Sequence, residues 1–345
     1  MIRFPAPLRA GSTIAVTAPS SGVLPPYHKR LDIVYEHLKD QGFGIVEGGC
    51  LRSDHKHVSA PKEQRAQELM RFWSDSAVDL IFPPWGGELA IDLLPLLDFE
   101  QMKASPTWIQ GFSDTSTYLL PITLLTGIAT SHGTNLIDSV PRQTDELTRN
   151  ALNILRMQPG VVYRQNSSAM WQKAFADYKV DPGVGYVLTE ATDWKILGRN
   201  PNGSVSFSGR LIGGCIDTIA FLIGSKFGDV PAFIRTYRDQ GVILYLENCD
   251  QGPTDLFRYL THMKLAGWFD GLSGVLLGRS AGPNPSDSNS LQYAEVLEDI
   301  LGDLQIPVVY DCDIGHVVPQ MTLVNGAMAQ VFCERGSGWI DQTFA

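Results

Sequence analysis

The stretch "QGFSDTSTYLLP", residues 110–121, joins a strand-like segment to a helix-like one. Residues 108–112 are mostly apolar, and a helical pattern begins at Tyr118. A serine at such a junction is typical of a helix N-cap, because its oxygen can accept a hydrogen bond from an unpaired amide. It is equally typical of a nucleophile elbow, in which a sharp strand-to-helix turn exposes the serine. The segment alone leaves both interpretations of Ser113 open.

Upstream of this junction, strand-like and helix-like segments alternate. Apolar runs at 13–18, 44–47 and 78–82 are separated by segments with apolar residues at helical spacing, and a further helix is expected from Glu88. This order predicts a mostly parallel sheet covered by helices. Ligands of such sheets bind at the carboxyl ends of the strands, where both Ser113 and the loop 85–87 are expected to lie.

The second half returns to regular elements after an irregular region. Residues 166–205 are rich in glycine and proline and carry several aromatics, which predicts a linker and a long loop between an N-terminal domain, 1–165, and a C-terminal domain, 206–345. In the latter, a buried strand ends at Glu247, and Asn325-Gly326 between two apolar runs predicts a hairpin turn. The fold class expected is α/β, with a second domain built on a mixed sheet.

Length, net charge, cysteine content and apolar stretches limit the kinds of protein that this chain can be. The 345 residues exceed what one core usually serves, so two domains are expected. A formal charge of −10 disfavours nucleic acid as a partner. The five cysteines are dispersed without a paired motif, which favours free thiols in a reducing compartment over disulfides or a zinc site. The most apolar stretch is too short to cross a membrane, so a cytoplasmic protein without a membrane partner is expected.

Three residues could form a hydrolytic triad. A serine hydroxyl needs a base, an imidazole suits that task, and a carboxylate fixes the tautomer of the imidazole. Ser113, Glu247 and His316 supply these groups in chain order. Glu247 could equally be a solvated carboxylate at a strand end, and His316 a structural residue of a turn. Position 115 is threonine, so the Gly-x-Ser-x-Gly pattern of α/β-hydrolases is absent.

Other candidates are weaker. Gly86 and Gly87 could bring a backbone amide to Ser113, so that the amides of Gly87 and Asp114 would form an oxyanion hole, or they could simply make a tight turn. His55 and His57 lie in a polar loop without a third ligand, so no metal is expected. No glycine-rich nucleotide fingerprint is present, and no cofactor is expected.

Four segments together resemble one family. These are Trp85-Gly86-Gly87, Gly111-Phe112-Ser113-Asp114, Leu244-Tyr245-Leu246-Glu247, and Gly315-His316 followed by Pro319. Their order is similar to that of the LD-carboxypeptidase family of serine peptidases, which also contains the microcin C immunity hydrolases.

The resemblance implies a Rossmann-like N-terminal domain that carries the nucleophile Ser113 and a smaller C-terminal β/β/α domain. His316 would act as general base and then acid, Glu247 would orient it, and the amides of Gly87 and Asp114 would hold the oxyanion. Such enzymes need no metal or cofactor and are commonly homodimers.

The oxyanion loop departs from the murein-recycling members, because Trp85 and Glu88 flank its two glycines. That form and the long aromatic loop look more like the microcin immunity branch, where aromatics stack on a nucleotide-like group. The candidate substrate-binding residues are Trp85, Gly86, Glu88, His132, Trp171 and Trp194. The two tryptophans of the loop could instead only pin the loop to the body of the protein.

Three functions are therefore compatible with the sequence. The first is a carboxypeptidase that hydrolyses a C-terminal amide bond of a murein-type peptide. The second is an amidase that cleaves peptidyl- or aminoacyl-nucleotides. The third, from another class, is a peptide-binding protein without catalytic activity.

Overall fold

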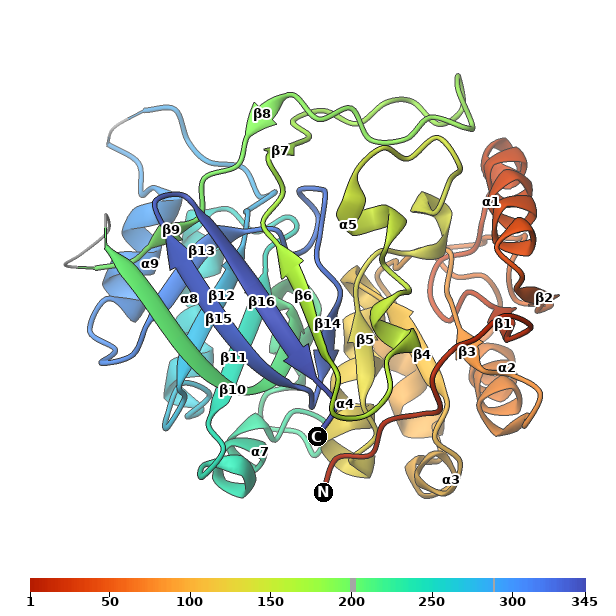
Figure 1. Cartoon of the computed structure of the whole chain (residues 1–345), viewed down its shortest axis with the longest axis horizontal. Helices are drawn as coiled ribbons and strands as arrows, with labels where there is room; N and C mark the ends of the chain where they lie inside the picture. The colour runs from red at the N-terminus through yellow and green to blue at the C-terminus, as the bar shows by residue number, and fades with distance from the viewer. Residues whose placement is uncertain (199–202, 288) are drawn as a thin grey trace.

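Two large sheets lie side by side in the computed structural model, which describes residues 1–198, 203–287 and 289–345. The first sheet has the strand order β14-β5-β4-β3-β1-β2, and the second has the order β6-β16-β15-β10-β11-β12-β13-β9 (Figure 1). A separate two-stranded sheet joins β7 to β8. This is the predicted α/β fold class: a mostly parallel sheet with helices, followed by a mixed sheet.

The first sheet is built from short buried strands. Strands β1 to β5 run parallel where they pair, and β14 joins β5 antiparallel at the edge. The strand bounds are β1 Thr13–Val16, β2 Gly44–Glu47, β3 Leu80–Ile81, β4 Trp108–Gly111, β5 Thr130–His132 and β14 Leu323–Asn325. The helices of this half are α1 His28–Asp40, α2 Lys62–Ser74, α3 Phe99–Ala104, α4 Ser116–Thr126 and α5 Glu146–Arg149.

The second sheet has a parallel centre, in which β10 to β13 are paired in sequence order. Antiparallel strands flank this centre on both sides. The bounds are β6 Val162–Asn166, β9 Lys195–Ile196, β10 Ser204–Cys215, β11 Val242–Glu247, β12 Gly274–Gly278, β13 Val308–Cys312, β15 Met328–Glu334 and β16 Ser337–Thr343. The remaining elements are β7 Met170–Trp171, β8 Glu190–Ala191, α6 Ile216–Ile219, α7 Val230–Tyr237, α8 Pro253–Leu265 and α9 Tyr293–Leu301.

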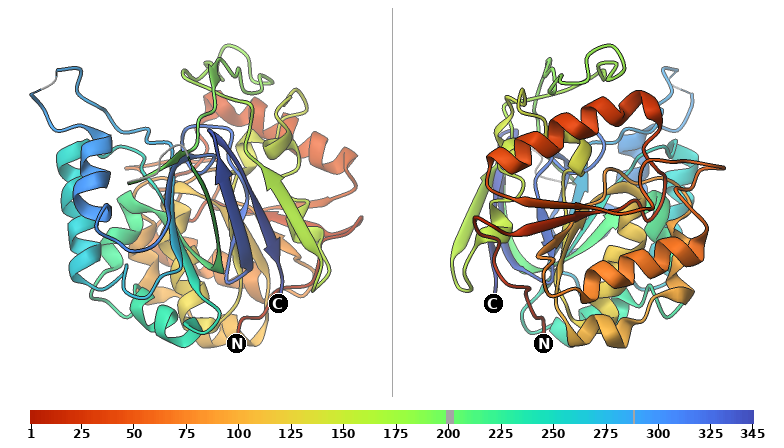
Figure 2. Two further views of the ribbon diagram at one scale, coloured as in Figure 1. Left: turned by 60° about the vertical axis from the view of Figure 1, so that its left-hand side comes forward. Right: turned by 90° about the vertical axis from the view of Figure 1, so that its right-hand side faces the viewer.

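Helices cover the sheets as buried parallel strands require. Helices α1 and α2 lie on opposite faces of the first sheet, and α8 and α9 lie together on one face of the second (Figure 2). The two chain ends are neighbours, because the rings of Phe4 and Phe344 stack with centroids 4.5 Å apart. Among the described residues, no helix combines the length and the apolar character that a membrane crossing requires.

The two sheets are joined at β14. This strand belongs to the first sheet, but the side chain of its last residue, Asn325, reaches both sheets. Asn325 Oδ1 accepts hydrogen bonds from the Gly213 amide at 3.1 Å and from Tyr245 Oη at 2.8 Å, both in the second sheet. Asn325 Nδ2 lies 3.1 Å from Thr130 Oγ1 in β5. A buried amide with all these partners fixes how the two sheets meet.

Three local expectations differ from the structure. The turn at Asn325-Gly326 forms, but its flanking strands do not make a hairpin, because β14 pairs with β5 and β15 pairs with β10. The helix expected from Glu88 is instead a 3₁₀ helix, η2, over Ala90–Leu96, with Pro95 inside it. The region expected to be linker and loop carries β7 to β9, and β9 pairs with β13 in the second sheet.

Candidate active site

Ser113 lies where β4 turns into the helix α4. It is the first residue of a short 3₁₀ helix, η3, Ser113–Thr115, that leads directly into α4. Its φ is +64°, a left-handed conformation that costs a non-glycine residue about 1–2 kcal/mol. The N-cap positions of η3 and α4 are occupied by Phe112 and Thr115, so Ser113 is not a helix N-cap and the capping interpretation is wrong. A strained, half-buried serine at a strand-to-helix turn has the geometry of a nucleophile elbow.

The Gly86-Gly87 loop packs directly against this turn. A Cβ on Gly86 would lie 2.8 Å from the Asp114 amide nitrogen and 2.9 Å from Ser113 Oγ, so only glycine fits. The Asp114 carboxylate fixes neighbouring loops, because Asp114 Oδ2 accepts hydrogen bonds from Ser20 Oγ at 2.5 Å and from the Ala90 amide at 2.8 Å. Within the described residues, the backbone amides of Gly87 and Asp114 donate no hydrogen bond. Both remain available to a ligand oxygen.

Glu247 and His316 form a buried pair in the second sheet. Glu247 ends β11 and is 1% exposed, and His316 Nδ1 donates to Glu247 Oε2 over 2.7 Å. The preceding residue, Gly315, has a φ of +86°, and a Cβ there would lie 2.5 Å from Glu247 Cβ and 2.6 Å from Glu247 Cδ. The turn can therefore bring the imidazole to the carboxylate only because residue 315 is glycine.

The pair shifts the protonation of both partners. Burial alone would lower the pKa of His316, but the facing carboxylate of Glu247 raises that pKa well above the ordinary value. Burial alone would raise the pKa of Glu247, but the charge and hydrogen bond of His316 lower it overall. Because the Nδ1 proton is held by Glu247, the Nε2 atom of a neutral His316 is the one that can accept a proton.

Phe112 brings the serine turn and the histidine turn together. Its ring centroid lies 4.8 Å from that of His316, and the two rings are in an edge-on arrangement. No hydrogen bond joins Ser113 Oγ to His316 in the part of the chain that the structure describes. Such contacts are often long in ligand-free enzymes and tighten when substrate binds. The helix after the serine turn is also tied to the second sheet, because Ser116 Oγ in α4 accepts a 3.1 Å hydrogen bond from the amide of Cys215 at the end of β10.

The sequence argument missed one residue that supports the histidine turn. Arg279, which follows β12, is buried, and its Nη2 donates to Asp313 Oδ1 at 2.7 Å. The same nitrogen donates to the carbonyls of Val317 at 3.1 Å and Pro319 at 3.0 Å, so Arg279 binds residues before and after His316. A buried arginine with several backbone acceptors signals a positioning role, but the partners are distant in sequence, so spacing alone could not reveal it.

The candidate substrate-binding residues lie in different environments. Trp85 is half-buried, and its indole nitrogen donates a 3.0 Å hydrogen bond to the Ser21 carbonyl. Glu88 is exposed. His132 is fully buried between the rings of Phe112 and Tyr245, so it is not open to a ligand in this structure.

The two tryptophans differ as well. Trp171 is half-buried in β7, where its indole nitrogen donates to the Ala191 carbonyl at 3.1 Å. Trp194, a candidate substrate contact, is instead buried: its side chain is 2% exposed and donates to Asp313 Oδ2 at 2.9 Å. Trp194 is therefore part of the second sheet's core, and only Trp171 is positioned for contact with a ligand.

A cavity of about 370 Å³ adjoins the histidine turn. Trp171, Tyr293 and Val317 line it together with Arg279, and Val317 is the residue that follows His316. Lys195 and Asp311, which also line it, form an ion pair of 2.8 Å. The aromatic wall and the polar groups of this cavity suit a flat or polar substrate group.

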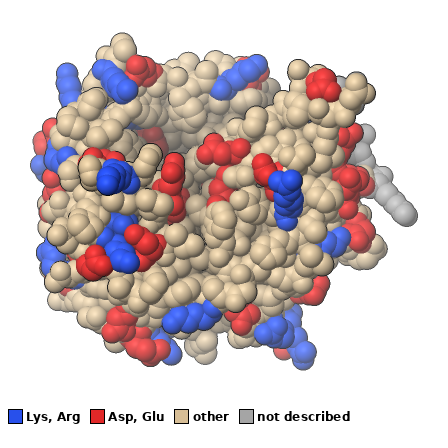
Figure 3. Space-filling view, turned by 180° about the vertical axis from the view of Figure 1, so that it is seen from behind, with Lys and Arg blue, Asp and Glu red and all other residues tan. Residues whose placement is uncertain are grey.

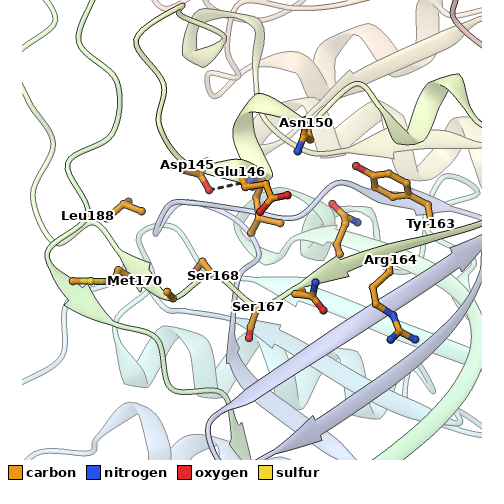
Figure 4. Close-up of a pocket in the computed structure, with 13 residues that line it drawn as sticks. Asp145, Glu146, Asn150, Tyr163, Arg164, Ser167, Ser168, Met170 and Leu188 are labelled. Carbon is orange, nitrogen blue, oxygen red and sulfur yellow. Dashed lines mark hydrogen bonds between the residues drawn. The ribbon is translucent and has the colours of Figure 1, made fainter.

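A larger cavity of about 550 Å³ lies apart from the candidate triad, between α5 and the segment that carries β6 and β7 (Figure 4). Asp145, Tyr163, Arg164 and Met170 are among the residues that line it. Within it, the Asp145 carboxylate accepts hydrogen bonds from the amides of Leu147 and Thr148 and so caps α5. Its walls include none of Ser113, Glu247 and His316, and the smaller cavity likewise reaches the histidine turn only through Val317.

The face seen in Figure 3 carries Lys and Arg side chains scattered among Asp and Glu, without a broad basic region. A nucleic-acid backbone requires such a region. The charge distribution on this face therefore agrees with the net charge of −10.

Comparisons with known proteins agree with the geometry. The model of the LD-carboxypeptidase N-terminal domain matches residues 14–133, and that of the LD-carboxypeptidase C-terminal domain matches residues 208–331. Ser113 falls within the first match, and Glu247 and His316 fall within the second.

Relatives are similar along nearly the whole chain. The "Microcin C7 self-immunity protein MccF" of Escherichia coli is 28% identical over 93% of this chain and 90% of its own length. The "Probable murein peptide carboxypeptidase" of Bacillus subtilis is 24% identical over 94% and 90%. A solved structure of MccF in complex with glutamyl sulfamoyl guanosine superposes with a TM-score of 0.82 at 26% identity, covering 98% of both chains. The chain belongs to the LD-carboxypeptidase family, which includes the MccF microcin C immunity proteins.

Proposed function

We propose that this chain is a serine-type carboxypeptidase that hydrolyses a C-terminal amide bond of a murein-type peptide. Ser113 would attack the carbonyl carbon, His316 would accept the serine proton and then protonate the leaving amine, and Glu247 would hold the imidazole. The observation that supports this most strongly is the buried 2.7 Å contact between His316 and Glu247, next to a serine with a φ of +64°.

The amides of Gly87 and Asp114 would stabilise the oxyanion that forms when Ser113 attacks. Their support is the close packing of Gly86 on the serine turn and the absence of competing acceptors in the described residues. Removal of one such donor typically costs about 10²- to 10³-fold in kcat.

A second substrate class is supported by a separate observation. Trp171 lines a cavity that also includes Val317, the residue after His316, and an indole can stack on a nucleobase. MccF, the relative crystallised with an aminoacyl sulfamoyl nucleoside, is similar to this chain over nearly its whole length. An amidase that cleaves peptidyl- or aminoacyl-nucleotides is therefore the alternative function.

The test is hydrolysis of a murein tetrapeptide and of an aminoacyl sulfamoyl adenosine by the purified chain and by Ser113→Ala. We expect the wild-type chain to cleave one of them and the alanine variant to lose several orders of magnitude in turnover. A variant that keeps more than about a tenth of wild-type turnover would refute the nucleophile, because triad knockouts remove far more. Binding of a peptide without cleavage by the wild-type chain would favour the non-catalytic function.

Three further expectations are kept as proposals. The chain would be a homodimer in a cytoplasmic compartment, and its domains would divide at about residues 165 and 206. Light scattering of the purified chain would test the dimer, and limited proteolysis between the proposed domains would test the boundaries.

A further inference from the structure

Two thiols lie next to the candidate Glu247–His316 pair, and neither has a place in the proposed hydrolysis. Cys215 ends β10 and stands in parallel register with Glu247, so the two side chains emerge next to each other at the carboxyl ends of adjacent strands. Cys215 Sγ, a Glu247 carboxylate oxygen and a His316 ring nitrogen all lie within 4.8 Å of one another. Cys249, two residues after Glu247, is a second free thiol and is partly buried.

One oxygen of the Glu247 carboxylate in this cluster is free to bind a cation. Glu247 Oε2 accepts the proton of His316 Nδ1, but Glu247 Oε1 has no hydrogen-bond partner among the described residues, although the residue is 1% exposed. A second carboxylate is close, because Asp217 Oδ2 lies 3.5 Å from Cys215 Sγ. A buried carboxylate oxygen without a partner is costly, and a bound cation would remove that cost.

The donor types select the class of cation. Thiolate and imidazole ligands favour zinc and similar thiophilic ions over magnesium and calcium, which prefer oxygen. Zinc holds sulfur at about 2.3 Å and nitrogen at about 2.0 Å, which puts tetrahedral ligands roughly 3.5 Å apart. His316 Nδ1 and Glu247 Oε2 are already 2.7 Å apart, so Cys215 Sγ, which lies within 4.8 Å of both residues' ligand atoms, would need to approach by about 1 Å, and rotation of its side chain can supply that.

We propose that Cys215, Glu247 and His316 form an inhibitory site for Zn²⁺ and chemically similar divalent cations. On binding, the Cys215 thiol releases its proton to solvent, the proton of the neutral His316 moves from Nδ1 to Nε2, and the metal binds the vacated Nδ1. The neutral imidazole then carries its remaining proton on Nε2, so it has no lone pair with which to accept the proton of Ser113. The inhibition rests on the proposed hydrolysis, whereas the binding does not.

Cobalt substitution tests the binding directly. Titration of the purified wild-type chain with Co²⁺ should give one equivalent of a species with a thiolate-to-cobalt charge-transfer band and the visible bands of a tetrahedral ion, and Zn²⁺ should abolish both. Cys215→Ser should weaken cobalt binding by more than about 10- to 100-fold, the loss that even an outer-shell change causes. Cys333→Ser, which changes a buried cysteine outside the cluster, is the matched control and should leave the titration unchanged.

His316→Ala provides a second variant that leaves both thiols in place and should also weaken cobalt binding. An absent charge-transfer band, or a band that survives in both Cys215→Ser and His316→Ala, would overturn the metal site. If cobalt binds as expected but Zn²⁺ leaves hydrolysis unaffected, the inhibition is refuted while the site stands. If the chain has no hydrolytic activity, the titration still decides whether the site exists.

Discussion

Replacement of Glu247 by glutamine tests the candidate triad most directly. The substitution keeps the size of the side chain but converts the acceptor at 2.7 Å from His316 Nδ1 into an amide. The amide NH₂ can donate to Nδ1 only when that nitrogen is unprotonated, and the imidazole proton then sits on Nε2, facing the serine. The carbonyl end of the amide can still accept from Nδ1–H, but it no longer stabilises an imidazolium.

The size of the expected drop in kcat follows from the wrong tautomer of His316 and the loss of the charge that stabilises its imidazolium. A comparable Asp-to-Asn change in another serine peptidase reduces kcat about 10⁴-fold through the wrong tautomer. That factor corresponds to about 5.5 kcal/mol of transition-state stabilisation. Because Glu247 is 1% exposed, water cannot replace the lost carboxylate, so we expect a reduction near this value.

The pH profile gives a readout that misfolding would not produce. The carboxylate of Glu247 raises the pKa of His316 against the opposing effect of burial. In Glu247→Gln burial persists without the carboxylate, so the pKa of His316 should fall and the residual activity should appear at lower pH than in the wild type. The assay is kcat/KM from about pH 5 to 9, with the melting temperature recorded for each variant. Asp250→Asn, an exposed acid three residues away, is the control.

A loss of less than about tenfold in kcat/KM, compared with the 10⁴-fold expected for a triad carboxylate, would refute the reasoning. So would an unchanged pH limb in a folded variant, because the carboxylate would then not be what sets the protonation of the histidine.

Three further predictions follow from the same geometry. Wild-type kcat/KM should rise with pH along a limb above the ordinary histidine pKa of about 6.5, since only neutral His316 can accept a proton and its pKa is raised; a limb below that value would contradict the pairing. Gly86→Ala should lower kcat about 10²- to 10³-fold by displacing Ser113 and the Asp114 amide, whereas Gly49→Ala should not, and equal activities would exclude the close packing. Trp171→Ala should weaken an aminoacyl-nucleotide substrate about five- to 150-fold, the value of one base stacked on an aromatic ring, and leave a murein peptide nearly unaffected; equal losses would show that the indole only holds its loop.

The sequence predicted those features that depend on neighbours along the chain. Ser113 and Glu247 each follow an apolar strand, and the alternation of strands and helices fixes the edge of the sheet at which such residues lie. The fold class follows from the same alternation. The protonation of His316 could not be predicted, because it depends on a carboxylate 69 residues away and on the turn that Gly315 permits.

Long-range pairing explains the local errors. Asn325-Gly326 has the composition of a hairpin turn, and a turn forms there, but the partners of the two strands lie in different sheets. Trp194 stands among loop residues in the sequence, yet its indole finds an acceptor in Asp313, 119 residues downstream. Secondary-structure propensity describes the preference of a segment in isolation. The strand partners at 325–326 and the burial of Trp194 depend instead on contacts that form only in the folded chain.

The joint between the sheets has a consequence for activity. Ser113 belongs to the first sheet, and Glu247 and His316 to the second, so the candidate triad exists only when the two are docked. That docking is held by Asn325, which bonds to both sheets, and by the contact of Ser116 Oγ with the Cys215 amide. Ser116 is one helical turn from Ser113, and Cys215 stands opposite Glu247 in the register of β10 and β11. The contact of Ser116 with Cys215 thus links the neighbourhoods of Ser113 and Glu247, and a shift of the sheets would separate the candidate nucleophile from the candidate base.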